Sequence, residues 1–198
     1  MITLPKLPEI VTGTLANGMK YIFIPTKGNG LIHASLLGYA GAILENEPAT
    51  YGVAHCLEHV VLEGTKSFPT EKSISDMFDK NGCRRNGLTG MGKKEYWITT
   101  GIEKKQEAIQ YISECLFAPI LDPVIIEREK RIIANELKKS LSNLDTTKGH
   151  NNYKASFDME RLGVHIIGTI DSVSNLSRSD LEKFHSKFYT PSNFIFAI

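Results

Sequence analysis

The stretch "YGVAHCLEHVVLEGT", residues 51–65, has the composition of a buried helix but carries His55, Glu58 and His59. Successive helical residues are rotated by about 100°, so His59 lies ~40° from His55 and Glu58 lies ~60° from it on the other side. All three side chains therefore point into one sector of the helix. Two imidazoles one turn apart can bind one zinc ion, and a carboxylate that does not bind the metal can act as a general base. An ordinary core or surface helix is the alternative.

A later predicted helix places two carboxylates on one face. The segment "DPVIIEREKRIIANELKKSLSN", residues 122–143, has helical periodicity, with Pro123 in its first turn. Glu129 and Glu136 are seven residues apart, ~20° short of two full turns, so they share a face. Because a catalytic zinc takes three protein ligands, this face can supply the third. A solvated charged edge is the alternative.

The remaining segments alternate strand and helix signals and predict an α+β fold. Asn17-Gly18 is a strong hairpin signal between two apolar runs, and residues 84–102 are typical of two strands around a glycine-rich turn. We expect a two-layer domain, residues 1–198, in which a mixed, mostly antiparallel β-sheet is backed by α-helices. Further strands are expected at 31–39 and 193–198, and further helices at 71–82, 104–118 and 177–189.

Local patterns predict several finer features. Thr50 is the expected N-cap of the first helix, and the polar stretch "LDTTKGHNNY", residues 144–153, predicts a mobile loop before a short helix near 152–161. Trp97 is expected in the core and Cys56 as a small buried residue. Histidines without a partner at ligand spacing, such as His165, are expected on the surface or satisfied in the core.

Charge and cysteine content limit the classes of partner and location. The 23 basic and 22 acidic residues give a net charge of +1, which predicts no interaction with nucleic acid or an anionic membrane. Apolar stretches are shorter than the ~20 residues of a membrane helix. The three cysteines lack regular spacing, and "MITLPKLPEI" has neither a basic segment nor an apolar signal core. We therefore expect a cytoplasmic protein.

The residues also resemble a known family. His55-Cys56-Leu57-Glu58-His59 has the order of the inverted zincins, and Glu136 follows after the 76 residues 60–135, as the third ligand does in insulinase and pitrilysin-like metallopeptidases. The resemblance extends to the family's opening hairpin, its zinc helix and the last strand of its first domain. The corresponding segments are "GTLANGMKYIFIP" (13–25), "GYAGAILENEPATYGVAHCLEHVVLEGT" (38–65) and "YTPSNFIFAI" (189–198).

This resemblance implies roles for individual residues. His55, His59 and Glu136 would ligate one Zn²⁺ per chain, Glu58 would be the general base, and Glu129 would support the site as a second carboxylate. The residues Asn86, Gly87, Leu88 and Thr89 lie where the family usually has Asn-Ala-x-Thr, on an edge strand to which a substrate peptide adds. Gly87 departs from that pattern, and an ordinary hairpin strand is the alternative.

The implied activity is zinc-dependent endopeptidase hydrolysis of extended, unstructured peptides, either in general turnover or in peptide processing and maturation. Family members have more domains than this chain provides and enclose substrate between two halves. We therefore expect a partner subunit, or a homo- or hetero-oligomer, to complete the cleft, unless the chain is a fragment. A non-catalytic scaffolding or binding subunit of a larger peptidase-like complex is the alternative.

Overall fold

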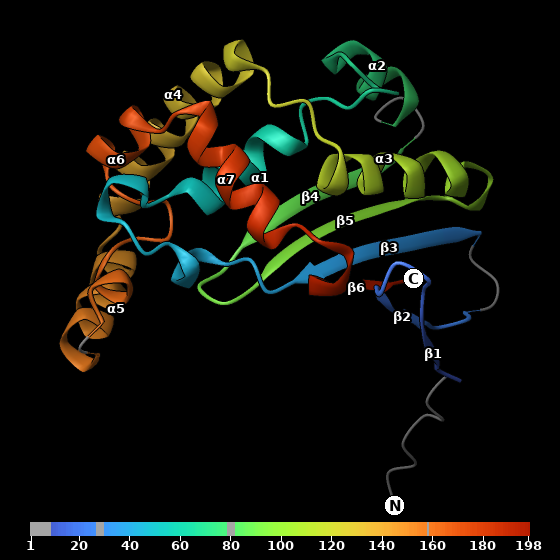
Figure 1. The fold of residues 1–198 in the computed structure, drawn as a ribbon, viewed down its shortest axis with the longest axis horizontal. Coiled ribbons are helices and arrows are strands. Elements are labelled where there is room, and N and C mark those ends of the chain that lie inside the picture. The colour runs from blue at the N-terminus through green and yellow to red at the C-terminus, as the bar shows by residue number, and fades with distance from the viewer. Residues whose placement is uncertain (1–8, 27–29, 79–81, 158) are drawn as a thin grey trace, which may run out of the picture.

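A mixed six-stranded sheet forms one layer of the computed structural model, which describes residues 9–26, 30–78, 82–157 and 159–198 (Figure 1). The strand order is β1-β2-β6-β3-β5-β4, so β1 and β4 are the edges. Strand β2 pairs parallel with β6, and the other neighbours pair antiparallel. The strands are β1 (Val11–Thr14), β2 (Lys20–Phe23), β3 (Leu31–Gly38), β4 (Arg84–Thr89), β5 (Lys94–Gly101) and β6 (Phe194–Ala197).

Helices form the second layer, which confirms the predicted α+β class. Figure 1 shows α1, α3 and α7 over one face of the sheet, whereas α5 projects beyond its end. The helices are α1 (Val53–Val61), α2 (Glu71–Met77), α3 (Lys105–Phe117), α4 (Pro123–Leu141), α5 (Leu144–Ser156), α6 (Ile170–Asn175) and α7 (Arg178–Phe188). Short 3₁₀ helices are η1 (Ala42–Leu44), η2 (Pro48–Thr50), η4 (Ile102–Lys104), η5 (Glu160–Gly163) and η6 (Pro191–Asn193). No helix in the described ranges is long and apolar enough to cross a membrane.

The hairpin of β4 and β5 shows the expected alternation of buried and exposed side chains. Tyr96, Ile98 and Thr100 are buried against the helices, and the Tyr96 hydroxyl lies 2.7 Å from that of Tyr189. Trp97 points to the opposite face and is only half-buried, so its predicted core position is wrong. Strand β4 pairs with β5 along its whole length and forms the sheet edge that lies beside α1.

Helix α1 is buried on nearly all sides. Eight of its nine residues are buried, because it lies between the sheet and the helices α4 and α7. Apolar side chains consequently occupy most of its circumference, as expected for a helix enclosed on nearly all sides. Cys56 is fully buried, in agreement with its predicted structural role, and burial raises the pKa of its thiol to about 12.

The start of α1 differs from the prediction. Thr50 belongs to η2, and the N-cap of α1 is Gly52, whose φ of +94° favours glycine. The Glu45 carboxylate accepts hydrogen bonds from the N–H groups of Gly52 and Ala54, both at 2.9 Å, and so satisfies the helix start. A distant carboxylate therefore replaces the local hydroxyl that the sequence pattern suggested.

Residues 144–153, predicted to be a loop, are helical. Asn143 caps α5, since its Oδ1 accepts from the N–H groups of Asp145 and Thr146 at 2.9 and 3.3 Å. α5 has almost no amphipathic pattern, which is why periodicity did not reveal it. It continues to Ser156, so the short helix expected at 152–161 is the end of α5 followed by η5. The prediction also omitted α6.

Candidate metal centre

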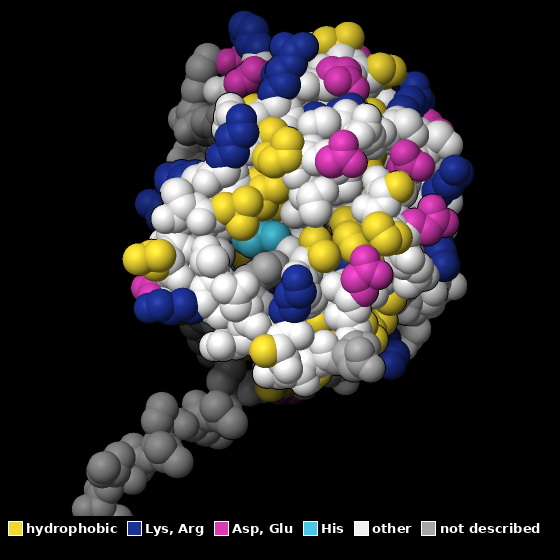
Figure 2. Space-filling view, turned by 90° about the vertical axis from the view of Figure 1, so that its left-hand side faces the viewer, with side chains coloured by type: hydrophobic (Ala, Val, Ile, Leu, Met, Phe, Trp, Pro, Cys, Tyr) yellow, Lys and Arg dark blue, Asp and Glu magenta, His cyan; other side chains and the backbone are white. Residues whose placement is uncertain are grey.

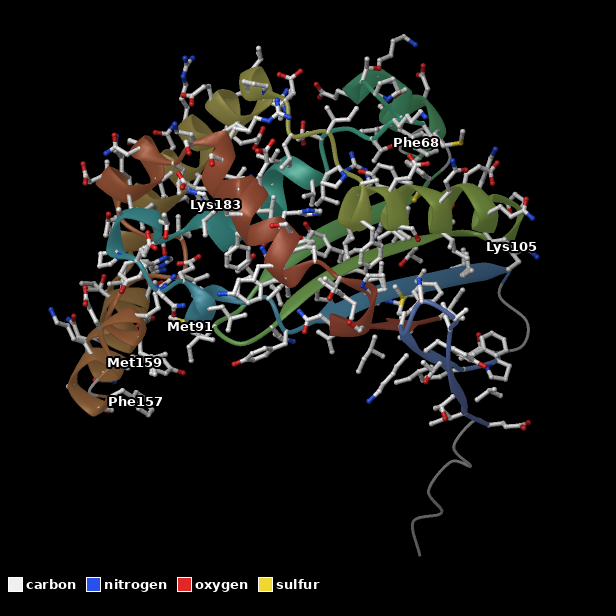
Figure 3. All side chains as sticks on the ribbon, viewed as in Figure 1. Phe68, Met91, Lys105, Phe157, Met159 and Lys183 are labelled. Carbon is white, nitrogen blue, oxygen red and sulfur yellow. The ribbon has the colours of Figure 1, made fainter. Side chains whose placement is uncertain are left out.

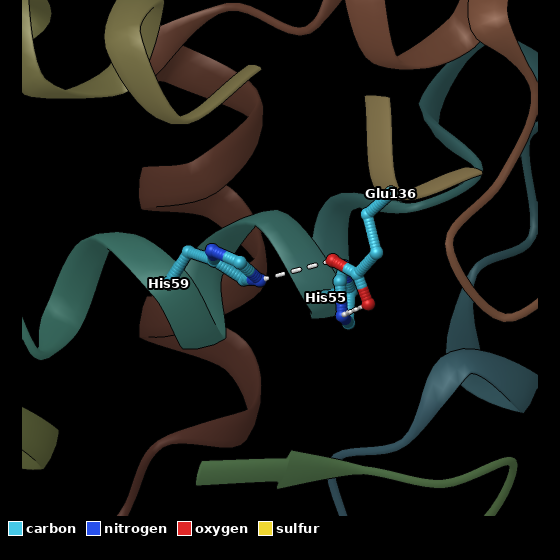
Figure 4. A group of neighbouring side chains, drawn as sticks. All are labelled: His55, His59 and Glu136. Atoms are coloured by element: carbon cyan, nitrogen blue, oxygen red, sulfur yellow. Dashed lines mark ion pairs between the residues drawn. The ribbon is translucent and has the colours of Figure 1, made fainter. Parts of the chain in front are cut away.

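Three side chains with metal-binding atoms meet at the contact of α1 and α4 (Figure 4). His55 Nε2 lies 3.8 Å from Glu136 Oε1, and His59 Nε2 lies 3.6 Å from Glu136 Oε2. One donor atom from each residue falls within 4.8 Å of the others. The structure thus brings together the three residues that the sequence predicted as ligands, although their role remains a prediction.

The spacing of these atoms fits a tetrahedral zinc site. With bonds of about 2.0–2.1 Å, neighbouring ligand atoms around tetrahedral zinc are ~3.3 Å apart. The two N···O separations, which run to the two different oxygens of Glu136, exceed this value by a few tenths of an ångström, and one ligand atom from each residue lies within 4.8 Å of the others. Small side-chain rotations would bring two nitrogens and one carboxylate oxygen into the range, a donor set typical of catalytic zinc.

Glu129 holds His59 in the orientation that a metal ligand requires. The His59 ring donates from Nδ1 to Glu129 Oε2 at 3.1 Å, and its Nε2 faces Glu136. Glu129 is buried, and the hydrogen bond from His59, assisted by Arg128, lowers the pKa of its carboxyl group. Arg128 donates from Nε to Glu129 Oε1 at 2.9 Å and also bonds Glu63. Glu129 is therefore placed behind the trio as an anionic acceptor.

Burial affects the two histidines differently. Burial, together with the nearby His59 and Lys94, lowers the pKa of His55 to about 3, so its imidazole is neutral and can bind a metal. Burial also opposes the charging of His59, but its bond to Glu129 and the surrounding carboxylates outweigh that effect and raise its pKa. In the described part of the chain, His55 Nδ1 is buried without a hydrogen-bond partner, whereas Nε2 faces Glu136.

Glu58 lies against the edge strand. Thr89 donates a hydrogen bond from its hydroxyl to Glu58 Oε2, and a Cβ at Gly87 would lie 2.7 Å from Glu58 Cγ. Gly87 and Thr89 are two residues apart, so they face α1 from the same side of β4. The glycine that departs from the expected Asn-Ala-x-Thr pattern is thus the residue on which Glu58 packs. Asn86 and Leu88 are exposed.

A cleft of about 470 Å³ opens in front of these residues. His165 lies in its wall, where its Nδ1 accepts from the N–H of Ile167 at 3.2 Å and its Nε2 lies 2.9 Å from Ser140 Oγ. The sequence predicts His165 on the surface or satisfied in the core, and no ligand spacing marks it as part of a site. The lining comprises His55, Glu58, His59, Asn86, Gly87, Leu88, Thr89, Glu136, Ser140, His165, Ile166 and Ile167.

A buried arginine joins this wall to the metal helix. Arg161 donates to the carbonyls of Val164, His165 and Ile166 at 2.9–3.2 Å. The same guanidinium pairs with Glu45, whose carboxylate also caps α1. Both side chains are almost completely buried, so the position of the wall and the start of α1 depend on one ion pair.

Comparison with known proteins identifies the family. The insulinase family, peptidase family M16, matches residues 34–170, which include α1, β4 and α4. The chain belongs to this family. An uncharacterized zinc protease of Rickettsia bellii is 28% identical over 184 residues, covering 93% of this chain and 44% of that protein. The mitochondrial-processing peptidase subunit beta of Dictyostelium discoideum is 26% identical, covering 92% of this chain and 39% of that protein.

The fold is also shared. A protease from Helicobacter pylori superposes with a TM-score of 0.87 at 23% identity, covering 96% of this chain and 46% of the other. The predicted membership of the insulinase and pitrilysin-like family is therefore confirmed. The chain spans less than half the length of each of these relatives.

Proposed function

We propose that this chain is the zinc-binding, catalytic portion of a metalloendopeptidase that hydrolyses extended, unstructured peptides. The observation that carries the proposal is the meeting of three ligand atoms within 4.8 Å, beside a carboxylate that packs on an exposed edge strand. Membership of the insulinase family and similarity to the zinc protease of Rickettsia bellii support the same reaction class.

His55, His59 and Glu136 would hold one zinc ion, whose chemistry there is Lewis acidity toward a carbonyl oxygen and a water molecule. Glu58 takes a proton from the attacking water and then passes it to the nitrogen of the departing amine. The Thr89 hydroxyl orients the Glu58 carboxylate during these transfers. Glu129 keeps the proton of His59 on Nδ1, so that Nε2 remains a ligand.

The substrate would bind to the free edge of β4. One side of β4 pairs with β5, and the other forms part of the cleft at residues 86–89. An extended peptide can hydrogen bond to the outward backbone groups there once the Asn86 side chain, whose Oδ1 accepts from the Gly87 N–H at 3.0 Å, moves aside. Its scissile bond would then pass the metal trio. Folded segments cannot present these groups, so we expect cleavage in unstructured regions.

A second polypeptide or further domains would complete the cleft. The relatives are more than twice as long as the part that this chain matches, and one of them is named as a subunit. We therefore propose that the peptidase acts as a homo- or hetero-oligomer, or as part of a longer chain. Both arrangements would cover the open side of the cleft.

Two substitutions test the assignment. Glu58→Gln should retain zinc but lower turnover by roughly 100- to 10,000-fold, because general acid–base catalysis contributes about that much. Glu136→Gln should instead weaken zinc binding. Products from unstructured peptides are identified by mass spectrometry, with a chelated sample as the control. Hydrolysis that survives Glu58→Gln would remove Glu58 from its role, and peptides that bind to the zinc-loaded chain without cleavage would indicate a binding subunit.

A further inference from the structure

A hollow of about 430 Å³ lies at the start of the edge strand β4. The strand runs from Arg84, which pairs with Thr99 near the end of β5, to Thr89 in the metal cleft. Figure 3 marks the two ends of this hairpin, with Met91 at the turn after β4 and Lys105 where α3 follows β5. Histidine atoms lie in a depression at the Met91 end, which faces the viewer in Figure 2, so the hollow lies farther along the same edge. The residues that line this arginine hollow are Cys83, Arg84, Arg85, Asn86 and Trp97.

The arginine hollow carries positive charge without a matching carboxylate. Arg84 is exposed, and in the described ranges neither Arg84 nor Arg85 forms an ion pair. Arg85 donates to the Tyr111 hydroxyl at 3.1 Å, but its Nε is buried and has no hydrogen-bond partner among the described residues. Because a guanidinium partly removed from water lacks a counter-charge here, the hollow favours an anionic ligand.

Three lining side chains share the face of the sheet that the helices leave open. Asn86 pairs with Trp97 across the two strands, and Arg84 lies two residues before Asn86. Trp97 is only half-buried, and the NH₂ group of Asn86 has no acceptor in the described part of the chain. On the same face, the carboxylate of Glu95 lies 3.4 Å from Ser35 Oγ and 3.7 Å from Lys93 Nζ. The hollow thus offers a guanidinium and an amide donor, which suit a planar carboxylate.

A peptide bound to the edge of β4 would reach this hollow. Arg84 precedes Thr89 by five residues, which is ~17 Å at about 3.3 Å per residue. Antiparallel pairing is the more stable arrangement, and it directs the C-terminal side of the peptide toward Arg84. Glu58 packs on Gly87 and accepts from Thr89, so the scissile bond would lie opposite this part of β4. The peptide residue opposite Arg84 then follows the scissile bond by about three to five residues.

We propose that the arginine hollow binds a carboxylate of the substrate peptide, about three to five residues on the C-terminal side of the scissile bond. This inference rests on the proposed peptidase function and adds a substrate class to it. The substrates are extended peptides with an acidic side chain, or with their own C-terminal carboxylate, at that distance. Pairing with β4 sets the distance, and Arg84 recognises the charge.

The test uses the full, zinc-loaded chain with Glu58→Gln, so that peptides bind without being cleaved. The probes are uncharged polar peptides, acetylated and amidated at their ends, in which one glutamate is moved along the sequence and compared with glutamine at the same position. Fluorescence anisotropy of labelled peptides gives the affinities. At one register, glutamate should bind roughly three- to five-fold more tightly than glutamine, as expected for an exposed ion pair. Added salt should reduce the difference.

Trp97 reports where the glutamate lies, because it is the single tryptophan of the chain. At the favoured register, its emission should change more with the glutamate peptide than with the glutamine peptide. A second series of peptides ends at that register, with either a free or an amidated C-terminus. A preference for the free acid in this series would identify the peptide end as a source of the carboxylate, whereas a preference confined to internal glutamate would identify an acidic side chain.

Arg84→Gln is the variant that removes the recognising charge. Because Arg84 is exposed, the melting temperature should stay nearly unchanged. The preference for glutamate should disappear, while the glutamine peptide still binds. Arg131→Gln is the matched control, since it removes the same charge from an exposed position on α4 that lines neither the cleft nor the arginine hollow. This control should keep the preference.

The outcomes separate the carboxylate site from the proposed function. Equal binding of the glutamate and glutamine peptides at every register, or a preference that survives Arg84→Gln, would overturn the site alone. A preference that Arg131→Gln reduces as strongly as Arg84→Gln would indicate long-range attraction without a site, and would also overturn it. Failure of every peptide to bind would overturn the proposed function and the site with it.

Discussion

Glu129→Gln provides a stringent test of how the metal centre is supported. Glu129 is 4% exposed and accepts hydrogen bonds from His59 Nδ1 at 3.1 Å and Arg128 Nε at 2.9 Å. Glutamine has nearly the same size, so the packing of α4 is retained. The substitution removes the negative charge and leaves only one acceptor oxygen for two donors. His59 therefore loses the partner that fixes its ring and increases the basicity of Nε2.

The expected loss follows from the strength of a charge-assisted hydrogen bond. Such a bond contributes about 1.5–3 kcal/mol, and 1.4 kcal/mol corresponds to a factor of ten in an equilibrium constant. Zinc affinity should therefore fall by roughly 10- to 100-fold, which is also the typical effect of removing the partner of a ligating histidine. The fold should persist, because the apolar contacts of α4 are unchanged.

The assay is competition for zinc between the chain and a chromophoric chelator at neutral pH, with thermal melts of the metal-free chain as a check on folding. Glu127→Gln is the matched control on the same helix. The carboxylate of Glu127 is largely exposed and pairs with Lys130 at 2.8 Å, so its removal should leave zinc affinity almost unchanged. If folded Glu129→Gln bound zinc as tightly as the native chain, Glu129 would not support the site.

Three further predictions concern the surroundings of the site. Gly87→Ala places a methyl group 2.7 Å from Glu58 Cγ, so Glu58 must shift, and steady-state kinetics should show turnover reduced by about ten-fold at unchanged zinc affinity. Burial lowers the pKa of Lys94 from 10.5 to about 8. Between about pH 8 and pH 10.5, Lys94 keeps its proton in the unfolded chain but has lost it in the folded chain. The free energy of unfolding, measured with urea, should therefore rise by on the order of 3 kcal/mol across this pH range, and Lys94→Met should not show this rise. Arg161→Met leaves Glu45 buried without its partner and should cost about 3–5 kcal/mol in the same measurement; a loss below about 1 kcal/mol would contradict the structural role of the pair.

Local periodicity was sufficient where one element decides the geometry. The alternation of Tyr96, Ile98 and Thr100 predicted a strand with one buried face, and the spacing of His55 and His59 predicted two imidazoles on one sector of a helix. These features depend on backbone periods of two and 3.6 residues, which hold in any tertiary setting. The same reasoning placed Glu129 and Glu136 on one face of α4.

Local reasoning could not assign the two carboxylates to different atoms of one ring. In the structure Glu129 approaches Nδ1 of His59 while Glu136 approaches Nε2. That distinction depends on how α4 lies against α1, which is a property of packing. The resemblance to the insulinase family, through the 76-residue spacing, distinguished only their roles, with Glu136 as a zinc ligand and Glu129 as a supporting carboxylate. For α5, with neither an apolar stripe nor a family motif, the loop prediction was wrong.

The start of α1 shows what the zinc motif does not contain. The Glu45 carboxylate caps the helix and pairs with Arg161, 116 residues later. Arg161 also donates a hydrogen bond to the carbonyl of His165 in the cleft wall. Because the two side chains are separated so far in the chain, no helical or strand period links them. A chain could keep His55, His59 and Glu136 and still misplace them if this buried pair were lost. An intact motif is therefore necessary for the proposed peptidase, but the ion pair behind it determines whether the ligands and the cleft wall face each other.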